Sequence, residues 1–394
     1  MADWASLWDL DPAVIFLNHG SFGACPRAVL DAQRRLVEEM EQEPVRFLSR
    51  ELEGRLDAAR AALGAFLGAD ADDLAFVPNA TAGVNTVLRA LRWGPTDEVL
   101  TTDHAYNACR NAAVAAAERD GGRVVVAAVP FPLDSPDRVL EAVLARVTPR
   151  TRLALLDHVT SPTGLVFPIA RLVAELAARG VDTLVDGAHA PGMVPLDLRA
   201  LGAAYYAGNA HKWLCAPKGA AFLHVRRDRQ SAIRPLSISH GANSPRTDRS
   251  RFRLEFDWMG TDDPTPYLSV AEAIRYLGLL LPGGWPAVMA RNRELALAAR
   301  QQLAEALGTP LPCPDEMVGA LAALPLPEAT QPPSPATPRR DPLQDALFAR
   351  FGIEVPVMVW PAFPRRLIRV SAQLYTGPAD FARLAEALKS LLAG

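Results

Sequence analysis

A short apolar run, a polar tip and then a helical pattern recur along the first half of the chain. The apolar runs end at Asp103 and His104, at Asp157 and His158, and again at Asp186. Alternation of this kind predicts an α/β fold with an open, mostly parallel sheet. The carboxyl ends of parallel strands meet along one edge of such a sheet, so we expect the ligand crevice at these polar tips.

The pattern divides the chain into three parts. Residues 1–30 are predicted to contribute to a small domain and to the active site, 31–285 to form a large cofactor-binding domain, and 286–394 to form a smaller C-terminal α/β domain. Residues 229–263 are charged and lack apolar periodicity, which predicts an extended loop. The Pro-rich stretch 325–342 is predicted to be a mobile surface loop or a lid.

The charge and the cysteine content of the chain limit the classes of binding partner that we expect. The 41 basic and 44 acidic residues give a net charge of −3, which argues against nucleic acid or a membrane surface and favours a small-molecule substrate. Four widely separated cysteines form neither a disulfide framework nor a zinc motif, so no metal is expected. The first residues carry no export pattern. We therefore expect a cytoplasmic protein.

Asp186 and Lys212 are the main candidates for chemistry. Lys212 is flanked by small and apolar residues, so it is expected to be partly buried, with a lowered pKa that suits Schiff-base formation. Asp186 ends an apolar run, and a buried carboxylate needs a cation or donor. The pyridinium nitrogen of pyridoxal 5′-phosphate would supply one. An ordinary helix N-cap is the alternative, and the spacing alone does not decide.

Two glycine-containing turns are candidate ligand contacts. The turn from Asn79 to Gly83 connects a strand to a helix, where backbone N–H groups and the helix dipole favour a phosphate. Plain capping by Asn79 or Thr81 is the alternative. Near the start, Gly20 and Gly23 would allow the backbone to approach a ligand, although this segment alone favours an ordinary entry turn.

The motif VDGAHAPG…HKW resembles the fold-type I pyridoxal-phosphate enzymes of the class V aminotransferase family. Further motifs along nearly the whole chain strengthen the resemblance: LNHGSFG, NATAGVN, TTDHAY, HVTSPTGLV, GNAHKWLCAPKG, WMGTDDPT and IRVSAQLYT. Within that family they look most like isopenicillin N epimerases. The match is specific for the cofactor and much less so for the substrate.

The resemblance implies a role for each matching residue. Lys212 would form the Schiff base, and Asp186 would pair with the pyridine nitrogen. His104 would stack on the ring, with Tyr106 as its competitor for that role. The other implied cofactor contacts are Ala80, Thr81, His158, His189, Asn209, His211 and Thr261, the last reaching a neighbouring subunit. The implied substrate contacts are Asn18, His19, Gly20 and Arg369, whose guanidinium would hold an α-carboxylate.

The resemblance also implies a homodimer and chemistry at Cα of an amino acid or peptide. Epimerisation is the first expectation, with the proton returned by Tyr106, by a histidine or by a mobile Lys212. A carbon–sulfur lyase is the alternative, and an aminotransferase ranks below it. A desulfurase is disfavoured because no cysteine lies between the Pro-rich stretch and Arg369. A protein that binds the cofactor without catalysis is also disfavoured, since Lys212, Asp186 and Arg369 are all present.

Overall fold

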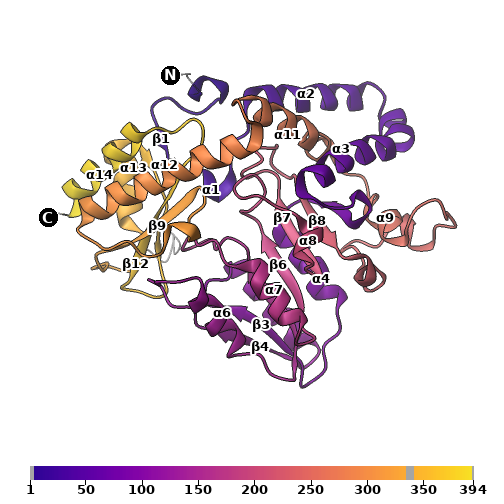
Figure 1. Cartoon of the computed structure of the whole chain (residues 1–394). Coiled ribbons are helices and arrows are strands. Elements are labelled where there is room, and N and C mark those ends of the chain that lie inside the picture. Colours follow the sequence, from indigo (N-terminus) through magenta and orange to yellow (C-terminus); the bar gives the residue numbers. More distant parts are fainter. Residues whose placement is uncertain (1–3, 334–340, 393–394) are drawn as a thin grey trace.

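The computed structural model describes residues 4–333 and 341–392. A seven-stranded sheet in the order β2-β8-β7-β6-β5-β3-β4 forms the centre of the larger part (Figure 1). Only β8 runs against the others. The strands are β2 (Leu74–Val77), β3 (Glu98–Thr102), β4 (Arg123–Ala127), β5 (Thr151–Asp157), β6 (Asp182–Gly187), β7 (Tyr205–Asn209) and β8 (Ala221–Val225).

Helices cover both faces of this sheet, which explains why its strands read as continuous apolar runs. Along β5, Leu153 and Leu155 pack into one core with α4 and α5, while Ala154 and Leu156 pack into the other. The helices of this part are α2 (Arg27–Gln42), α3 (Leu52–Leu67), α4 (Ala80–Ala90), α5 (Asn107–Arg119), α6 (Asp137–Leu144), α7 (Ile169–Ala177), α8 (Leu198–Leu201), α9 (Arg251–Phe256), α10 (Thr265–Leu268) and α11 (Val270–Leu279).

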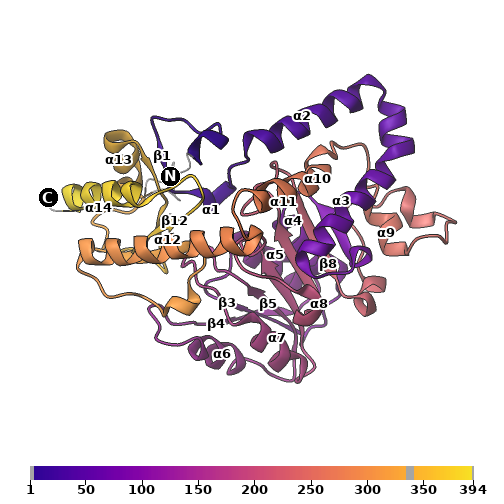
Figure 2. The ribbon, with the colours of Figure 1, turned by 45° about the horizontal axis from the view of Figure 1, so that its top comes forward.

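The smaller part contains a three-stranded antiparallel sheet in the order β11-β12-β9. The long helix α12 (Gly284–Leu307) begins beside α11 of the larger part and extends into the smaller part (Figure 2). There it packs on the sheet and on the C-terminal helix. The remaining elements are β9 (Leu321–Leu326), α13 (Pro342–Phe351), β10 (Ile353–Glu354), β11 (Val357–Val359), β12 (Arg366–Ser371) and α14 (Pro378–Leu392).

The N-terminal segment is tied to both parts. Strand β1 (Ile15–Phe16) pairs in parallel with β10 of the smaller part. The one-turn helix α1 (His19–Phe22) follows, and Gly23 then adopts a φ of 71°. A Cβ at this glycine would lie 2.1 Å from the carbonyl oxygen of His211, so the backbone can approach the loop after β7 only without a side chain.

The charged stretch 229–263 is not the extended loop that its composition predicted. It contains α9 and two 3₁₀ turns. Ion pairs hold this stretch against the larger part: Arg249 and Arg253 both bond to Asp57 of α3. Phe252 and Phe256 bury the other side of α9.

Within the described residues, no helix is both long and apolar enough to cross a membrane. The same residues contain no group of three or more His, Cys, Asp or Glu placed to hold a metal ion. In the Pro-rich stretch predicted to form a loop or lid, residues 334–340 lie outside the described residues.

Candidate active site

The carboxyl ends of β2, β5, β6 and β7 surround a cavity of about 430 Å³. The edge predicted from the polar strand tips is therefore the edge that is hollowed. Most of the predicted cofactor residues line it: Ala80, Thr81, Tyr106, Asp186, His189, Asn209, His211 and Lys212. The lining also includes Ser21, Phe22 and Ser161, which sequence reasoning did not single out.

At one end of the cavity, the N-terminus of α4 is held in place by two asparagines. Asn79 Oδ1 accepts a hydrogen bond from the Ala82 amide at 2.8 Å, and Asn209 Oδ1 accepts one from the Ala80 amide at 2.8 Å. The intervening Thr81 amide has no acceptor among the described residues. A free amide at a helix N-terminus attracts an anion.

Lys212 and His189 face each other across the cavity floor. Lys212 Nζ lies 3.2 Å from His189 Nε2, and Trp213 Nε1 donates to His189 Nδ1 at 3.4 Å. Because Nδ1 accepts, this network assigns the imidazole proton to Nε2. A neutral lysine amine can accept that proton in a hydrogen bond, whereas an ammonium cannot.

The surroundings of Lys212 and His189 shift both groups toward their neutral forms. Burial lowers the pKa of Lys212 from 10.5 to about 8, with the positive charge of Arg369 as the next cause, and Asp186 opposes the shift. Burial, followed by the charge of Lys212, holds the pKa of His189 well below its usual value. With a pKa of about 8, roughly a tenth of the Lys212 amines are neutral at pH 7, far more than for an ordinary lysine.

Two carboxyl groups lie side by side at the sheet edge. Asp157 and Asp186 are paired in the register of the adjacent strands β5 and β6, and both line the cavity. Asp186 Oδ1 accepts from the Ala188 amide at 3.0 Å. Burial and the nearby Asp186 raise the pKa of Asp157 well above its ordinary value. The neutral form of Asp157 is thereby favoured beside Asp186.

Arg369, on β12, is a buried cation without a counter-ion. Its side chain is 3% exposed. Nη1 bonds to the carbonyl and hydroxyl oxygens of Ser161, and Nη2 donates to Ser21 Oγ at 3.1 Å, while Nε has no partner. None of the described carboxylates forms an ion pair with it. An uncompensated guanidinium beside a cavity is a site for an anion.

The three N-terminal residues predicted to contact substrate lie just outside the cavity lining. Asn18 Nδ2 donates to Glu354 at 2.9 Å, and the Gly20 amide donates to Ser371 Oγ at 3.0 Å. The two ring nitrogens of His19 bond to the Tyr375 hydroxyl at 2.8 Å and to the Lys212 carbonyl at 3.0 Å. These residues hold α1 in place, and α1 presents the next two side chains, Ser21 and Phe22, to the cavity. The signal for both was present in the motif LNHGSFG.

The ring-stacking role predicted for His104 does not fit its position. His104 is fully buried outside the cavity, with Nδ1 bonded to Thr163 Oγ1 at 2.7 Å and Nε2 to the Val129 carbonyl at 3.0 Å. Its ring packs on Trp360 with centroids 4.6 Å apart. Tyr106, 43% exposed, lines the cavity instead.

His158 and Thr261 also lie away from the cavity lining. His158 Nδ1 bonds to the Tyr206 hydroxyl at 3.0 Å, a contact between two buried side chains. Thr261 is exposed on the loop between α9 and α10. Its predicted contact with a neighbouring subunit is compatible with this exposure and stays a prediction.

The aminotransferase class-V family model matches residues 15–320. The chain belongs to the aminotransferase class-V family. It is 40% identical over 396 residues to isopenicillin N epimerase of Amycolatopsis lactamdurans, covering 97% of this chain and 96% of that protein. It is 30% identical over 403 residues to a probable chloroplastic L-cysteine desulfhydrase of Arabidopsis thaliana, covering 97% and 84%.

Solved structures share the fold at lower identity. The cysteine desulfurase CsdA from Escherichia coli aligns with a TM-score of 0.77 at 20% identity, covering 99% of this chain and 97% of that chain. A mutant of C-DES with glycine covalently linked to its PLP cofactor aligns with a TM-score of 0.76 at 22% identity, covering 95% and 96%. The family resemblance and the fold-type I architecture predicted from the sequence are confirmed.

The lowered pKa of Lys212 gives a direct test. We expect reductive methylation of Lys212 with formaldehyde to speed up as the pH rises and to level off above about pH 8, because the neutral amine is the reactive form. Peptide mass spectrometry of the cofactor-free protein measures the rate, with the exposed Lys389 of α14 as the internal control. A Lys212 rate that keeps rising to pH 10 would contradict the desolvated environment.

Proposed function

We propose that this protein is a pyridoxal 5′-phosphate enzyme that removes and returns the proton at Cα of an amino acid or of an amino-acid end of a peptide. The observation that carries the proposal is the cavity itself. It combines a lysine of lowered pKa, the carboxyl group of Asp186 and the uncompensated cation of Arg369 at its border. Family membership supports the same cofactor class.

The residues present fit the cofactor. We infer that Lys212 binds its aldehyde carbon, that Asp186 faces its ring nitrogen, and that the unpartnered Thr81 amide, with His211 and the Asn209-braced start of α4, receives its phosphate. When bound, the group would supply an electron sink that makes the Cα–H bond of an attached amino acid acidic. His189, neutral and bonded to Lys212, would line its edge.

Arg369 would bind the α-carboxylate of the substrate. Its Nε has no partner and its Nη2 bonds only to Ser21 among the described residues, which leaves donors for a two-point contact. Ser21 and Ser161 hold the guanidinium from two sides without neutralising it. Fixing the carboxylate next to Lys212 would place the Cα–H bond within reach of the lysine amine, which then acts as the base.

Epimerisation further needs a proton donor for the other face of Cα. We assign this role to Tyr106, which lines the cavity, is partly exposed and can exchange its proton with water. The 40% identity to an isopenicillin N epimerase over nearly the full length supports epimerisation as the reaction. The exposed ring of Phe22 at the cavity would contact the substrate side chain.

A carbon–sulfur lyase is the second candidate, supported by the 30% identity to a probable L-cysteine desulfhydrase. The first step is shared, because Lys212 again takes the Cα proton. Loss of a thiolate from Cβ then replaces proton return, and cysteine would yield sulfide, ammonia and pyruvate. A persulfide-forming desulfurase is disfavoured, since the four cysteines are buried and none of them lines the cavity.

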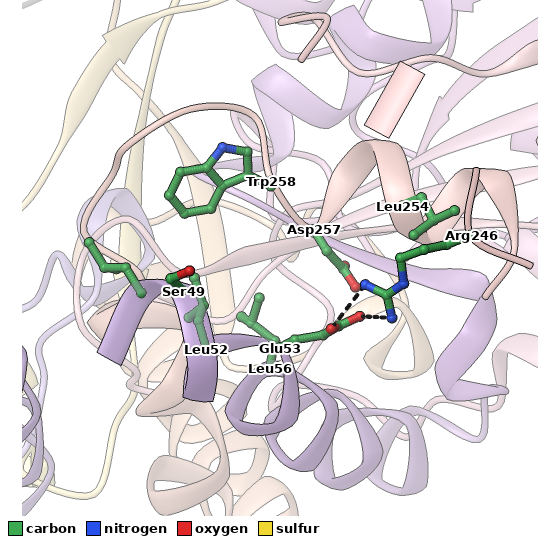
Figure 3. A pocket seen from close by; sticks show the side chains of 9 residues that line it. Ser49, Leu52, Glu53, Leu56, Arg246, Leu254, Asp257 and Trp258 are labelled. Atoms are coloured by element: carbon green, nitrogen blue, oxygen red, sulfur yellow. Dashed lines mark hydrogen bonds and ion pairs between the residues drawn. The ribbon is translucent and has the colours of Figure 1, made fainter. Parts of the chain in front are cut away.

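We further propose that the protein is a homodimer in which Thr261 reaches the cofactor phosphate of the partner subunit. An open groove of about 300 Å³ runs along α3, with Leu52, Leu56 and Trp258 on its walls (Figure 3). Trp258 precedes Thr261 on the same exposed loop. A groove that combines these apolar side chains with the Arg246–Glu53 ion pair, beside a loop that carries a predicted phosphate contact, fits a second copy of the chain.

Solvent-deuterium exchange distinguishes the two reactions. We expect deuterium to enter Cα of an accepted substrate in D₂O, with inversion and without pyruvate or sulfide, across a panel containing cysteine derivatives and an aminoadipyl peptide. Lys212→Ala should abolish exchange. Release of sulfide and pyruvate from cysteine at rates equal to exchange would instead establish the lyase.

Removal of the guanidinium tests the substrate site. We expect Arg369→Ala to raise KM about 100-fold while the bound cofactor keeps its absorbance, because two charge-assisted hydrogen bonds to the carboxylate are lost. Arg369→Lys, which keeps the charge but not the fork, should give an intermediate KM. Loss of cofactor together with substrate binding would show that Arg369 is structural.

The dimer is tested at the groove. We expect Trp258→Arg to convert a dimer into a monomer in sedimentation equilibrium and to weaken cofactor retention, since a partner's Thr261 would be withdrawn. Leu311→Arg, at an exposed position of the smaller part, is the matched control. A monomeric wild-type protein that retains cofactor would overturn this arrangement.

A further inference from the structure

The sulfur of Cys109 contacts Asp186, one of the residues that line the cavity. Cys109, on α5, is 1% exposed. Its Sγ donates to Asp186 Oδ2 at 3.1 Å. The thiol therefore joins α5 to the carboxylate at the tip of β6.

Both oxygens of Asp186 are occupied in this arrangement. Oδ1 accepts from the Ala188 amide at 3.0 Å, and Oδ2 accepts from Cys109. Two donors on different oxygens fix the rotation of the carboxylate plane, which a single donor leaves free. A thiol is a weak donor, so it orients Oδ2 without withdrawing much of its negative charge.

The thiol has a reason to stay protonated. Burial is the main cause that raises the pKa of Cys109, and Asp186 and Asp157 add to it. The groups that face this cluster are Asp186 and Asp157 from the sheet, Thr81 from α4 and the amine of Lys212. Both Cys109 and Asp157 are shifted toward their neutral forms, so the thiol keeps the proton that it donates to Asp186 Oδ2.

We propose that Cys109 is a positioning residue for the proposed cofactor: its thiol holds Asp186 in the orientation that would pair with the ring nitrogen. The inference rests on the proposed function. It assigns no covalent or redox step to the sulfur, which does not line the cavity. It explains a buried thiol placed directly against a carboxylate, an arrangement that plain packing does not require.

Two substitutions separate hydrogen bonding from packing, because they make opposite predictions. Cys109→Ser keeps a donor, whereas Cys109→Val keeps apolar bulk and removes the donor. We expect Cys109→Ser to retain cofactor affinity and kcat within about threefold, and Cys109→Val to lower both about tenfold with KM unchanged. If Cys109 only filled space, Cys109→Val would be tolerated better than Cys109→Ser, because burying a hydroxyl in an apolar site is costly. Cys313→Ser, in the smaller part, is the matched control and should match wild type.

The infrared S–H stretch supplies a readout that is independent of activity. We expect a band lowered in frequency by the carboxylate acceptor in wild type, absent in Cys109→Val and retained in Cys313→Ser. Loading the cofactor should move this band to higher frequency, because the ring nitrogen competes for the charge on Asp186. An S–H frequency that does not change when the cofactor binds would overturn the inference. So would a Cys109→Val variant with the kcat and cofactor affinity of wild type.

The same spectra distinguish failure of this inference from failure of the proposed function. If wild-type protein takes up no cofactor, the proposed function fails, while the lowered S–H band of the cofactor-free protein still tests the thiol–carboxylate bond. If cofactor binds and both Cys109 variants behave as wild type, the function stands and the positioning role is rejected.

Discussion

Burial of charge in one small cavity is the constraint on which the rest of this structure depends. Lys212 and Arg369 are both withdrawn from water, which lowers the pKa of each, and the charge of Arg369 lowers the pKa of Lys212 further. Asp186, at the sheet edge, opposes the shift of Lys212. A substrate carboxylate arriving at Arg369 would offset one of the two positive charges. It would thereby raise the basicity of Lys212 at the stage where the amine has to accept a proton.

Much of the fold and of the site was readable from the sequence because the relevant signals are local. The polar residues that end β5 and β6 identified the working edge of the sheet, and the HKW and VDGAH motifs identified Lys212 and Asp186. In a parallel sheet the carboxyl ends of neighbouring strands lie along one edge, independently of the conformation of the loops. The cavity lining follows from that rule for most of the predicted residues.

What was missed depends on contacts that no local pattern encodes. Whether His104 or Tyr106 faces the cavity is decided by bonds from His104 to Thr163 and Val129, which lie 59 and 25 residues away. The helical turns of 229–263 form because Arg249 meets Asp57, 192 residues earlier. Such partners become visible only once the chain has folded.

The bond between Arg369 and Ser21 joins residues 348 positions apart. Strand β1 likewise finds its partner only in β10. During synthesis on a ribosome the large sheet can fold first, but the substrate side of the cavity has to wait until nearly the last residues emerge. A truncated or stalled chain would carry Lys212 and Asp186 without the groups that select a substrate, so the order of synthesis delays completion of the site until the chain is whole.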